Sequence, residues 1–372
     1  MKNKIIKLLL VFLLLFTLIG CNKKISTGFL PVIKDDEFGD IYVVISKDDF
    51  FDLGFELGDS VDVEISNGVT LKDLPFYDGH YGYRGDELVI SYKSYPYIKI
   101  NSNSIGNTFN KYNLDENKDT IKITLKQRGK YLKGQESFSI SYSNDRNEYD
   151  SDVAFANYRE MVGGNLKEKT FYRSASPCND INSRAKYVDS LMSKDNIEYI
   201  IDLADNENKI SSYLEQNVDN PYWKQLYANN KVYLAGMNAD YGGEDFINKA
   251  ANVIRAILQN DGPFLIHCTE GKDRTGYICA LIEILADASL DELINDYMIT
   301  YDNYYNINKD TDIDKYDRFI KIQLFGFLNY LCGQDCGEEV KENELKHYAE
   351  EYLKKGGLTQ EEIGALKEKL KN

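Results

Sequence analysis

The sequence predicts an α/β domain with a central, largely parallel sheet flanked by helices and a helical C-terminal tail, preceded by a small all-β domain. Between residues 40 and 145, apolar residues alternate with polar ones, which is the period of half-buried strands. From residue 153 onwards, short apolar runs alternate with segments of helical period, as in a parallel sheet covered by helices. At 372 residues and 43% apolar composition, the chain is long enough to build two cores.

The first twenty residues have the composition of a secretion signal. Lysines lead into an apolar run that ends in LIGC and is too short for a membrane span of about 20 residues. The LIGC ending resembles the lipobox of bacterial lipoproteins, in which the cysteine carries the lipid. We therefore expect a signal peptide over 1–20, palmitate or a related acyl chain on Cys21, and a tether over 21–39. An ordinary signal peptide, or a short anchor helix with an unmodified Cys21, is the alternative.

Lipidation would place the protein on the extracytoplasmic face of the cell membrane, and two or more acyl chains would make the anchoring durable. The formal net charge of the chain is −16 at pH 7. A surface of that charge repels nucleic acid and anionic lipid headgroups, so we expect no nucleic-acid partner.

The region 40–145 is predicted to be a β-rich accessory domain, either a sandwich or a barrel. Glycine-containing turns separate the expected strands. The alternating apolar residues are Val61, Val63 and Ile65, then Ile121, Ile123 and Leu125, then Phe138, Ile140 and Tyr142. His80 and the neighbouring tyrosines form either a ligand-binding face or ordinary strand packing. The polar stretch 143–152 is predicted to be a linker.

The region 153–372 carries the pattern of the α/β domain. Buried strands are predicted over 197–203, 231–237 and 263–268, and residues 244–259 show one apolar helical face. A capping box, Ser289 with Glu292, opens the first helix of the predicted C-terminal helical tail.

The stretch HCTEGKDRTG, residues 267–276, joins the last predicted strand to a helix. Such a turn points several main-chain N–H groups at one position, with the positive end of the helix dipole behind them, and its glycines let the chain curl. Five residues separate Cys268 from Arg274. A thiol can therefore lie beneath a bound tetrahedral anion while the guanidinium holds two of its oxygens. The positive field of this loop favours the nucleophilic thiolate.

HCTEGKDRTG resembles the HCxxGxxR(S/T)G signature of cysteine-dependent phosphatases, and in particular the bacterial tyrosine and dual-specificity phosphatases whose loop reads HCxxGKDRTG. The segments 156–164, 171–177, 295–304 and 356–370 are similar to other parts of that family, so the resemblance covers about residues 153–371.

The resemblance implies catalytic roles for Cys268 as nucleophile, Arg274 as phosphate ligand and Asp273 as general acid. It implies substrate binding by Thr269, Glu270, Gly271, Lys272, Thr275 and Gly276, with the Thr275 hydroxyl donating to the departing thiolate. Arg173 either contacts substrate or braces the loop through Asp202, and His267 supports the loop by hydrogen bonds. Asp240, in a glycine-rich stretch after a predicted strand, is the alternative general acid.

Two departures from the family pattern bear on the substrate. Ala204 stands where the family often has an arginine, and Glu270 adds a negative charge to the loop. The negative charge of Glu270 makes highly phosphorylated inositides a less favoured substrate.

We expect no cofactor and no metal in the reaction, since three histidines in the whole chain exclude a histidine-rich site. Five cysteines follow Cys21, so at least one remains unpaired in the monomer. Cys332 and Cys336 form either a disulfide or two free thiols, with a two-ligand metal site as a less favoured alternative.

The expected function is that of a protein-tyrosine phosphatase acting on phosphorylated protein or peptide through a phosphocysteine intermediate. Hydrolysis of phosphoinositides or inositol phosphates by the same mechanism is the first alternative. Sulfur transfer of the rhodanese type also uses a cysteine in an anion loop, but the wider loop and the GKDRTG sequence argue against it. A catalytically weak phosphate-binding lipoprotein is the alternative from another class. The sequence leaves the oligomeric state open.

Overall fold

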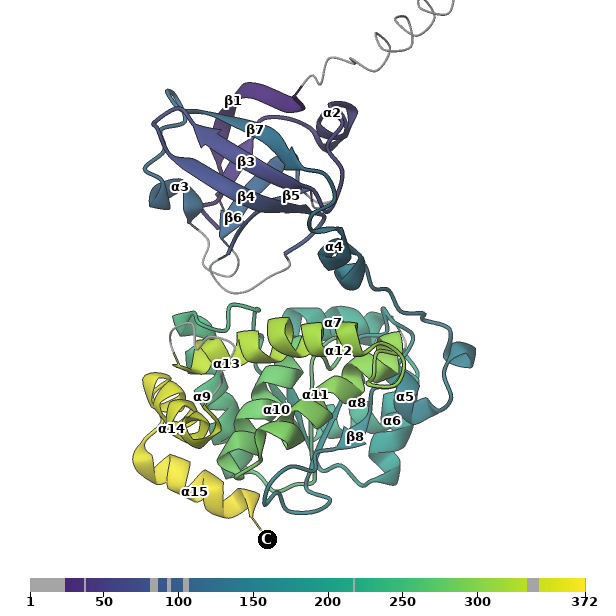
Figure 1. Cartoon of the computed structure of the whole chain (residues 1–372). Helices are drawn as coiled ribbons and strands as arrows, with labels where there is room; N and C mark the ends of the chain where they lie inside the picture. The colour runs from purple at the N-terminus through teal and green to yellow at the C-terminus, as the bar shows by residue number, and fades with distance from the viewer. Residues whose placement is uncertain are drawn as a thin grey trace, which may run out of the picture. The chain divides into compact units, whose positions relative to one another are not determined.

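The chain divides after Ser139 into two units, a β-barrel unit and an α/β unit that begins at Ile140 (Figure 1). The computed structural model describes residues 24–36, 38–80, 86–91, 95–102, 107–216, 218–332 and 341–371. Within these residues, none of the helices is both long enough and apolar enough to span a bilayer.

Seven strands of the first unit close into a barrel in the order β1-β2-β6-β5-β4-β3-β7. All neighbours pair antiparallel except β4 and β5, which are parallel. The strands are β1 (Ser26–Lys34), β2 (Ile41–Val43), β3 (Ser60–Ile65), β4 (Thr70–Tyr77), β5 (Glu87–Ile90), β6 (Ile98–Ser102) and β7 (Thr120–Gln127). Closure leaves no edge strand exposed to other chains. Of the two all-β architectures expected, the structure has the barrel.

Alternating apolar residues fill the barrel, as the sequence pattern predicts. Val61, Val63 and Ile65 of β3 face the interior, and Ile121 and Ile123 of β7 pack against them from the neighbouring strand. Short helices lie outside the strands: α2 (Lys47–Asp52), α3 (Thr108–Lys111) and α4 (Leu132–Phe138).

Two features of this unit differ from the sequence-based expectation. Strand β1 lies within 21–39, where a tether was expected. The sequence did not reveal this strand because only Val32 of its nine residues is fully buried, so its apolar alternation is weak. The third predicted strand, with Phe138, Ile140 and Tyr142, is absent: Phe138 ends helix α4, and residues 139–145 form neither helix nor strand. Three alternating residues were too few to distinguish a strand from the end of a helix.

The aromatic face expected near His80 is described only in part. His80 Nε2 shares a hydrogen bond of 2.7 Å with the Tyr95 hydroxyl, and its Nδ1 lies 3.1 Å from the Asn101 amide nitrogen. Tyr81, Tyr83 and Tyr92 lie outside the described residues.

The second unit is built on a five-stranded sheet in the order β11-β10-β12-β9-β8. Four strands run parallel, and β8 pairs antiparallel with β9 at the edge. The strands are β8 (Arg159–Glu160), β9 (Phe171–Ser174), β10 (Tyr199–Asp202), β11 (Val232–Leu234) and β12 (Phe264–His267). The three predicted strands are therefore present as β10, β11 and β12, and the sheet is largely parallel as expected.

Helices make up most of the remaining chain. They are α5 (Asp152–Phe155), α6 (Ala185–Lys194), α7 (Glu207–Glu215), α8 (Pro221–Ala228), α9 (Glu244–Gln259), α10 (Asp273–Leu285), α11 (Leu290–Tyr305), α12 (Ile313–Phe319), α13 (Phe325–Cys332), α14 (Glu342–Lys355) and α15 (Gln360–Leu370), with a π-helical turn η2 (Ile320–Leu324) between α12 and α13. Helix α10 is the central one, because all its residues from Thr275 to Leu285 are buried. A helix that is apolar on every side is typical of the middle of a core.

The C-terminal tail is helical, as predicted. The capping box at the start of α11 is present, with the Ser289 hydroxyl and the Glu292 carboxylate each satisfying a main-chain N–H group. Helices α14 and α15, drawn in yellow, follow at the end of the chain, and α14 packs on α9 and α10 (Figure 1).

The polar segment 143–152 includes a short 3₁₀ turn, η1 (Arg146–Glu148), and is held to the second unit. The buried guanidinium of Arg184, at the start of α6, donates to the Ser143 carbonyl at 3.1 Å and to the Tyr149 hydroxyl at 2.9 Å. The same guanidinium lies 5.0 Å from the centre of the Tyr142 ring and 4.9 Å from that of Tyr304, distances typical of cation–π contacts.

Candidate active site

The loop between β12 and α10 has the geometry of an anion cradle. β12 ends at His267, Cys268 follows at the carboxyl edge of the sheet, and α10 begins at Asp273. Gly271 has a φ of 70°, and a Cβ atom there would lie 2.2 Å from the Ser174 carbonyl oxygen. Only glycine fits this position, because the loop folds tightly against the end of β9.

Cys268 and Arg274 occupy the two ends of the loop. Cys268 is 3% exposed. Arg274 donates through Nη1 to the Met237 carbonyl at 3.0 Å and through Nη2 to the Thr269 hydroxyl at 3.4 Å. These contacts hold the guanidinium beside the loop, where it can bind two oxygens of a phosphate.

Lys272 and Asp273 form an ion pair at the start of α10. The Lys272 ammonium donates to both carboxylate oxygens of Asp273 at 2.9 Å, and it lies 3.9 Å from the Glu270 carboxylate. Burial opposes the charge of Lys272, but Asp273 and the other acidic groups around it outweigh burial and raise its pKa well above the usual value. Lys272 is therefore fully charged at neutral pH, and its charge is largely offset by its neighbours.

Thr275 and Gly276 lie in the first turn of α10. The Thr275 hydroxyl is buried and has no hydrogen-bond partner among the described residues, so it remains available to a group bound in the loop. A Cβ atom at Gly276 would lie 2.7 Å from the Tyr297 ring, which explains the glycine by close packing.

Arg173 is buried and supports the loop through a hydrogen bond to its main chain. Its Nη2 donates to the Gly271 carbonyl at 3.1 Å, and its Nη1 forms a short ion pair with Asp296 of α11. Of the two roles expected for Arg173, bracing fits its burial, but the acidic partner is Asp296 and not Asp202. The sequence could not reveal this, because Asp296 lies more than 120 residues away on the helical tail.

Asp202 and His267 lie side by side at the ends of β10 and β12. His267 Nε2 is 3.8 Å from Asp202 Oδ2, and both side chains are 0% exposed. Burial lowers the pKa of His267 to about 4 and raises the pKa of Asp202 to about 6. The imidazole is therefore neutral near pH 7, and its Nδ1 lies 3.4 Å from the Cys268 carbonyl oxygen.

Three residues that sequence reasoning did not single out hold Glu270 and the turn of the loop. The Asn157 amide donates to the carbonyls of Glu270 at 3.2 Å and Gly271 at 3.4 Å. The Tyr304 hydroxyl donates to the Glu270 carbonyl at 2.7 Å, and the Tyr142 hydroxyl donates to its carboxylate at 2.5 Å. Asn157 lies in the family-like segment 156–164 and could have been found there, whereas no sequence signal identified Tyr142.

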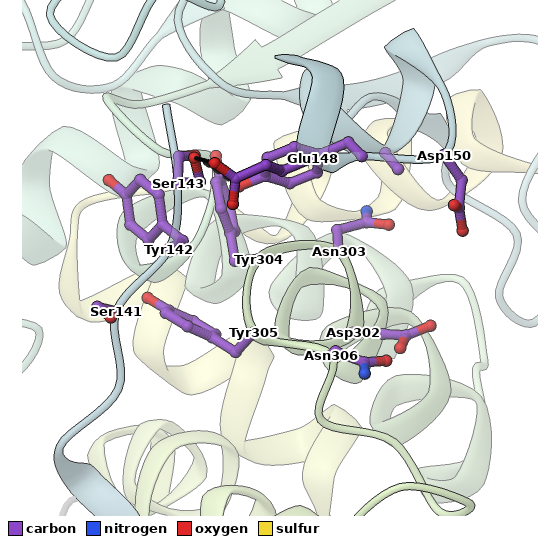
Figure 2. Close-up of a pocket in the computed structure, with 12 residues that line it drawn as sticks. Ser141, Tyr142, Ser143, Glu148, Asp150, Asp302, Asn303, Tyr304, Tyr305 and Asn306 are labelled. Carbon is purple, nitrogen blue, oxygen red and sulfur yellow. Dashed lines mark hydrogen bonds between the residues drawn. The ribbon is translucent and has the colours of Figure 1, made fainter. Parts of the chain in front are cut away.

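A cavity of about 490 Å³ is lined in part by Tyr142 and Tyr304, the two tyrosines that hydrogen-bond to Glu270 (Figure 2). Figure 2 shows Tyr142, Tyr304 and Tyr305 along it, with carboxylates of Glu148 and Asp302 on its wall. Its lining residues are Ser141, Tyr142, Ser143, Glu148, Tyr149, Asp150, Ala154, Asp302, Asn303, Tyr304, Tyr305 and Asn306. The cavity therefore combines aromatic and acidic walls, and it is connected to Glu270 through Tyr142 and Tyr304.

The alternative acid, Asp240, is exposed on the loop that follows β11. Tyr241, next to it, is buried and contacts the Tyr277 ring of α10 with 4.9 Å between ring centres. Asp273 is the first residue of α10. Asp240 lies on a segment that contacts α10 through Tyr241 and, through Met237, the Arg274 end of the loop between β12 and α10, here called the phosphate loop.

Two sequence predictions fall on residues without a described structure. The signal peptide and Cys21 lie outside the described residues, and so does Cys336. Cys332 is disulfide-bonded, whereas Cys178, Cys268 and Cys279 are free thiols.

A tyrosine-protein phosphatase of Nostoc commune is 33% identical over 123 residues, which are 31% of this chain and 42% of the relative. The chain thus spans less than half the length of that relative. The catalytic core of the PP-IP phosphatase SIW14 from S. cerevisiae aligns at 20% identity over 44% of this chain and 94% of that core. P. aeruginosa TpbA aligns at 16% identity over 64% of this chain and 99% of its own.

The TM-scores of both structural alignments are 0.25, too low to support a structural conclusion. The family model described as the tyrosine phosphatase family matches residues 154–372, which is more than half of the chain and includes the loop, its braces and the helical tail. The chain belongs to the tyrosine phosphatase family.

Proposed function

We propose that this protein is a cysteine-dependent protein-tyrosine phosphatase that hydrolyses phosphotyrosine esters. The observation that carries the proposal is the placement of Cys268 and Arg274 at the two ends of one tight loop, with the N-terminus of the buried helix α10 behind it. A tetrahedral dianion above Cys268 would meet main-chain N–H groups, the helix dipole and a planar guanidinium.

The chemistry follows from this placement in two steps. The Cys268 thiolate attacks phosphorus, an S–P bond forms, and the P–O bond to tyrosine breaks while an acid protonates the leaving phenolate. Water then attacks phosphorus, the S–P bond breaks, and inorganic phosphate leaves. We assign the acid to Asp273. We assign the donation that stabilises the departing thiolate to the Thr275 hydroxyl, which has no hydrogen-bond partner in the described part of the chain.

The cavity lined in part by Tyr142 and Tyr304 favours a phosphorylated protein or peptide over an inositol polyphosphate. Its aromatic walls suit apolar peptide side chains, while Glu148, Asp150 and Asp302 would repel further phosphate groups. We therefore propose that residues flanking the phosphotyrosine bind here, with a preference for basic ones.

Phosphoinositides or inositol phosphates are the second candidate substrates, because Lys272 provides another cation in the loop. Its ammonium already contacts both oxygens of Asp273 at 2.9 Å, which leaves little positive charge for a second phosphate. Because of this ion pair, we propose phosphoinositides as less favoured substrates than phosphotyrosine. A phosphate-binding protein without useful turnover would need a reason to keep both Cys268 and Arg274, which makes it the weakest alternative.

We further propose that the mature protein is a lipoprotein that is anchored through Cys21 on the extracytoplasmic face of the membrane. The support is the LIGC ending of the N-terminal apolar run.

A substrate panel with the full chain tests the proposal. We expect the kcat/KM for phosphotyrosine peptides to exceed that for phosphoserine peptides, inositol polyphosphates and phosphoinositide vesicles by at least tenfold, and lysine-flanked peptides to exceed glutamate-flanked ones. Cys268→Ser should abolish turnover and retain binding of the phosphopeptide, because the alcohol is not ionised at neutral pH. Turnover of Cys268→Ser within tenfold of wild type would refute the mechanism, whereas a preference for inositides would refute only the substrate.

A further inference from the structure

A cluster of three buried acidic groups lies behind the phosphate loop. Cys178 belongs to the connection between β9 and α6, Asp202 ends β10, and Asp205 follows three residues later. Cys178 Sγ is 3.8 Å from Asp202 Oδ2 and 4.0 Å from Asp205 Oδ2, and one ligand atom from each residue lies within 4.8 Å of the other two. All three residues are at most 1% exposed.

The Oδ1 atoms of Asp202 and Asp205 already accept hydrogen bonds from other groups, and these contacts fix the direction in which the Oδ2 atoms point. Asp202 Oδ1 accepts the main-chain N–H groups of Ala204 at 2.9 Å and Asp205 at 3.0 Å. Asp205 Oδ1 accepts the Tyr213 hydroxyl at 3.2 Å and lies 3.4 Å from the Lys209 ammonium. The two Oδ2 atoms are left facing the Cys178 sulfur. Metal ligands in proteins are commonly oriented by outer hydrogen bonds of this kind.

His267 borders the cluster through its Nε2 atom. Its Nε2 lies 3.8 Å from Asp202 Oδ2, is buried, and has no hydrogen-bond partner among the described residues. Its Nδ1 lies 3.4 Å from the Cys268 carbonyl oxygen, to which only a protonated Nδ1 can donate. The tautomer that makes this bond leaves the lone pair on Nε2, on the side of the carboxylate, which is the arrangement of a histidine that binds a metal.

The cluster gathers two carboxylates and a thiol in a buried space, and the basic groups near it lie outside it. Lys209 pairs with Asp205 Oδ1 at 3.4 Å, and Arg274 belongs to the phosphate loop.

We propose that Cys178, Asp202, Asp205 and His267 form a structural metal site for a divalent transition metal, with Zn²⁺ as the best fit. A thiolate and an imidazole select Zn²⁺ over Mg²⁺ or Ca²⁺, which prefer oxygen ligands only. Tetrahedral Zn²⁺ places neighbouring ligand atoms about 3.4–3.6 Å apart. The separations of 3.8 and 4.0 Å between Cys178 Sγ and the two carboxylates need to contract by a few tenths of an ångström. His267 Nε2 lies 3.8 Å from Asp202 Oδ2 but is not among the ligand atoms that all lie within 4.8 Å of one another, so the imidazole must also move toward the rest of the cluster.

The site would join the chain after β9 to the ends of β10 and β12, directly behind the nucleophile, because His267 precedes Cys268. All four ligands come from the protein, which leaves no open position for water or substrate, so the metal is a staple and takes no part in the reaction. This proposal stands independently of the substrate. A metal-free network, in which the Cys178 thiol hydrogen-bonds to the two carboxylates, is the competing account of the same contacts.

The test measures metal binding by the full chain in a Cys268→Ser background, which removes the thiolate of the phosphate loop as a ligand. After loading with Zn²⁺ and exhaustive dialysis, we expect one metal per chain and a raised melting temperature. With Co²⁺ in place of Zn²⁺, we expect a thiolate-to-cobalt charge-transfer band. Cys178→Ser and Asp205→Asn should each weaken metal binding at least tenfold. Cys178→Ser should also abolish the charge-transfer band, and Asp205→Asn should abolish the rise in melting temperature.

Cys279→Ser is the matched control, because Cys279 is also a buried free thiol but lies outside the cluster on α10. It should bind metal as the parent does. No stoichiometric metal in the parent, or binding and a cobalt band unchanged by Cys178→Ser, would overturn the proposal and favour the metal-free network. If a ligand variant fails to fold, the cobalt spectrum and metal content of the parent decide the question by themselves.

Discussion

The Arg274 guanidinium donates to the Met237 main-chain carbonyl at 3.0 Å, and this contact joins the phosphate loop to the loop that follows β11. Asp240 lies three residues beyond Met237 on that second loop. Asp273 lies next to Arg274 itself and has both carboxylate oxygens paired with Lys272. The two candidate acids are thus attached to the same arginine, one through the main chain and one through a hydrogen-bonded loop.

We predict that Asp273 is the general acid. Asp273→Asn should slow aryl phosphates with poor leaving groups by about 10²–10⁴-fold and those with good leaving groups much less, because only a poor leaving group needs the proton. Steady-state kinetics with a series of substituted phenyl phosphates measures this dependence.

Asp240→Asn is the control for this assignment, since it removes the other carboxylate without altering the Lys272 pair. It should behave like wild type across the leaving-group series. If Asp240→Asn shows the steep dependence and Asp273→Asn does not, the acid is carried by the loop after β11 and reaches the substrate by movement of that loop.

Gly271→Ala is predicted to distort the loop. The left-handed backbone alone costs alanine about 1–2 kcal/mol, and its Cβ would also meet the Ser174 carbonyl at 2.2 Å. We expect a loss of stability above 2 kcal/mol in urea denaturation, together with a large loss of turnover. Gly364→Ala, in helix α15 with no atom within 4 Å of the added Cβ, should instead be neutral or stabilising by up to about 1 kcal/mol. Equal stability of the two variants would contradict this account of the loop.

Much of the second unit could be predicted because its signals are local. The apolar runs at β10, β11 and β12, the helical face of α9 and the capping box at Ser289 are each written within a few consecutive residues. The loop motif likewise fixes the relation between Cys268 and Arg274, since the chain between them has only five residues. Patterns of this kind can be recognised without knowing which distant segments contact them in the folded chain.

What could not be predicted depends on contacts between distant segments. Arg173 and Asp296 pair across β9 and α11, and Tyr142 reaches Glu270 from a segment that looked like part of a β-strand. The cluster around Cys178 is formed only when the ends of parallel strands meet at one edge of the sheet. Charge and periodicity do not specify such partners, because many acidic and aromatic residues compete for them.

Cys279 is predicted to make the protein sensitive to alkali. Burial, with the neighbouring Glu283, raises the pKa of this thiol to about 12, although Arg173 opposes the shift. Between pH 9 and 12 the folded state then holds a proton that the unfolded state has lost, so stability falls as pH rises, by about 1.4 kcal/mol per pH unit from this group. Urea denaturation at pH 8, 9 and 10 should show a shallower decline for Cys279→Ala than for wild type. Parallel declines would mean that the thiol is as free to ionise in the folded state as in the unfolded one.

Cys21 is predicted to be the first residue of the mature protein and to carry two or three acyl chains. Cleavage before Cys21 and lipidation would make the protein partition into detergent and into membranes. Each CH₂ group of an acyl chain that is buried in the membrane contributes about 0.8 kcal/mol to the free energy of binding. Mass spectrometry of the native protein measures the modification, and Cys21→Ser should release the protein or leave the signal uncleaved. An unmodified N-terminus beyond residue 21 would contradict the proposal.

Arg173 is predicted to act as a positioning residue for the phosphate loop. Its two terminal nitrogens contact Gly271 and Asp296 at the same time, which a single lysine ammonium cannot reproduce. Arg173→Met breaks a buried ion pair and should cost about 3–5 kcal/mol of stability, whereas Arg173→Lys keeps the charge and should cost less. Both variants should lower kcat and raise the inhibition constant of inorganic phosphate, because the phosphate loop loses the contact from Arg173. If Arg173→Lys recovers stability but not phosphate affinity, the bidentate contact positions the loop. If phosphate inhibition is unchanged in both variants while stability falls, Arg173 only supports the fold, and the positioning role is refuted.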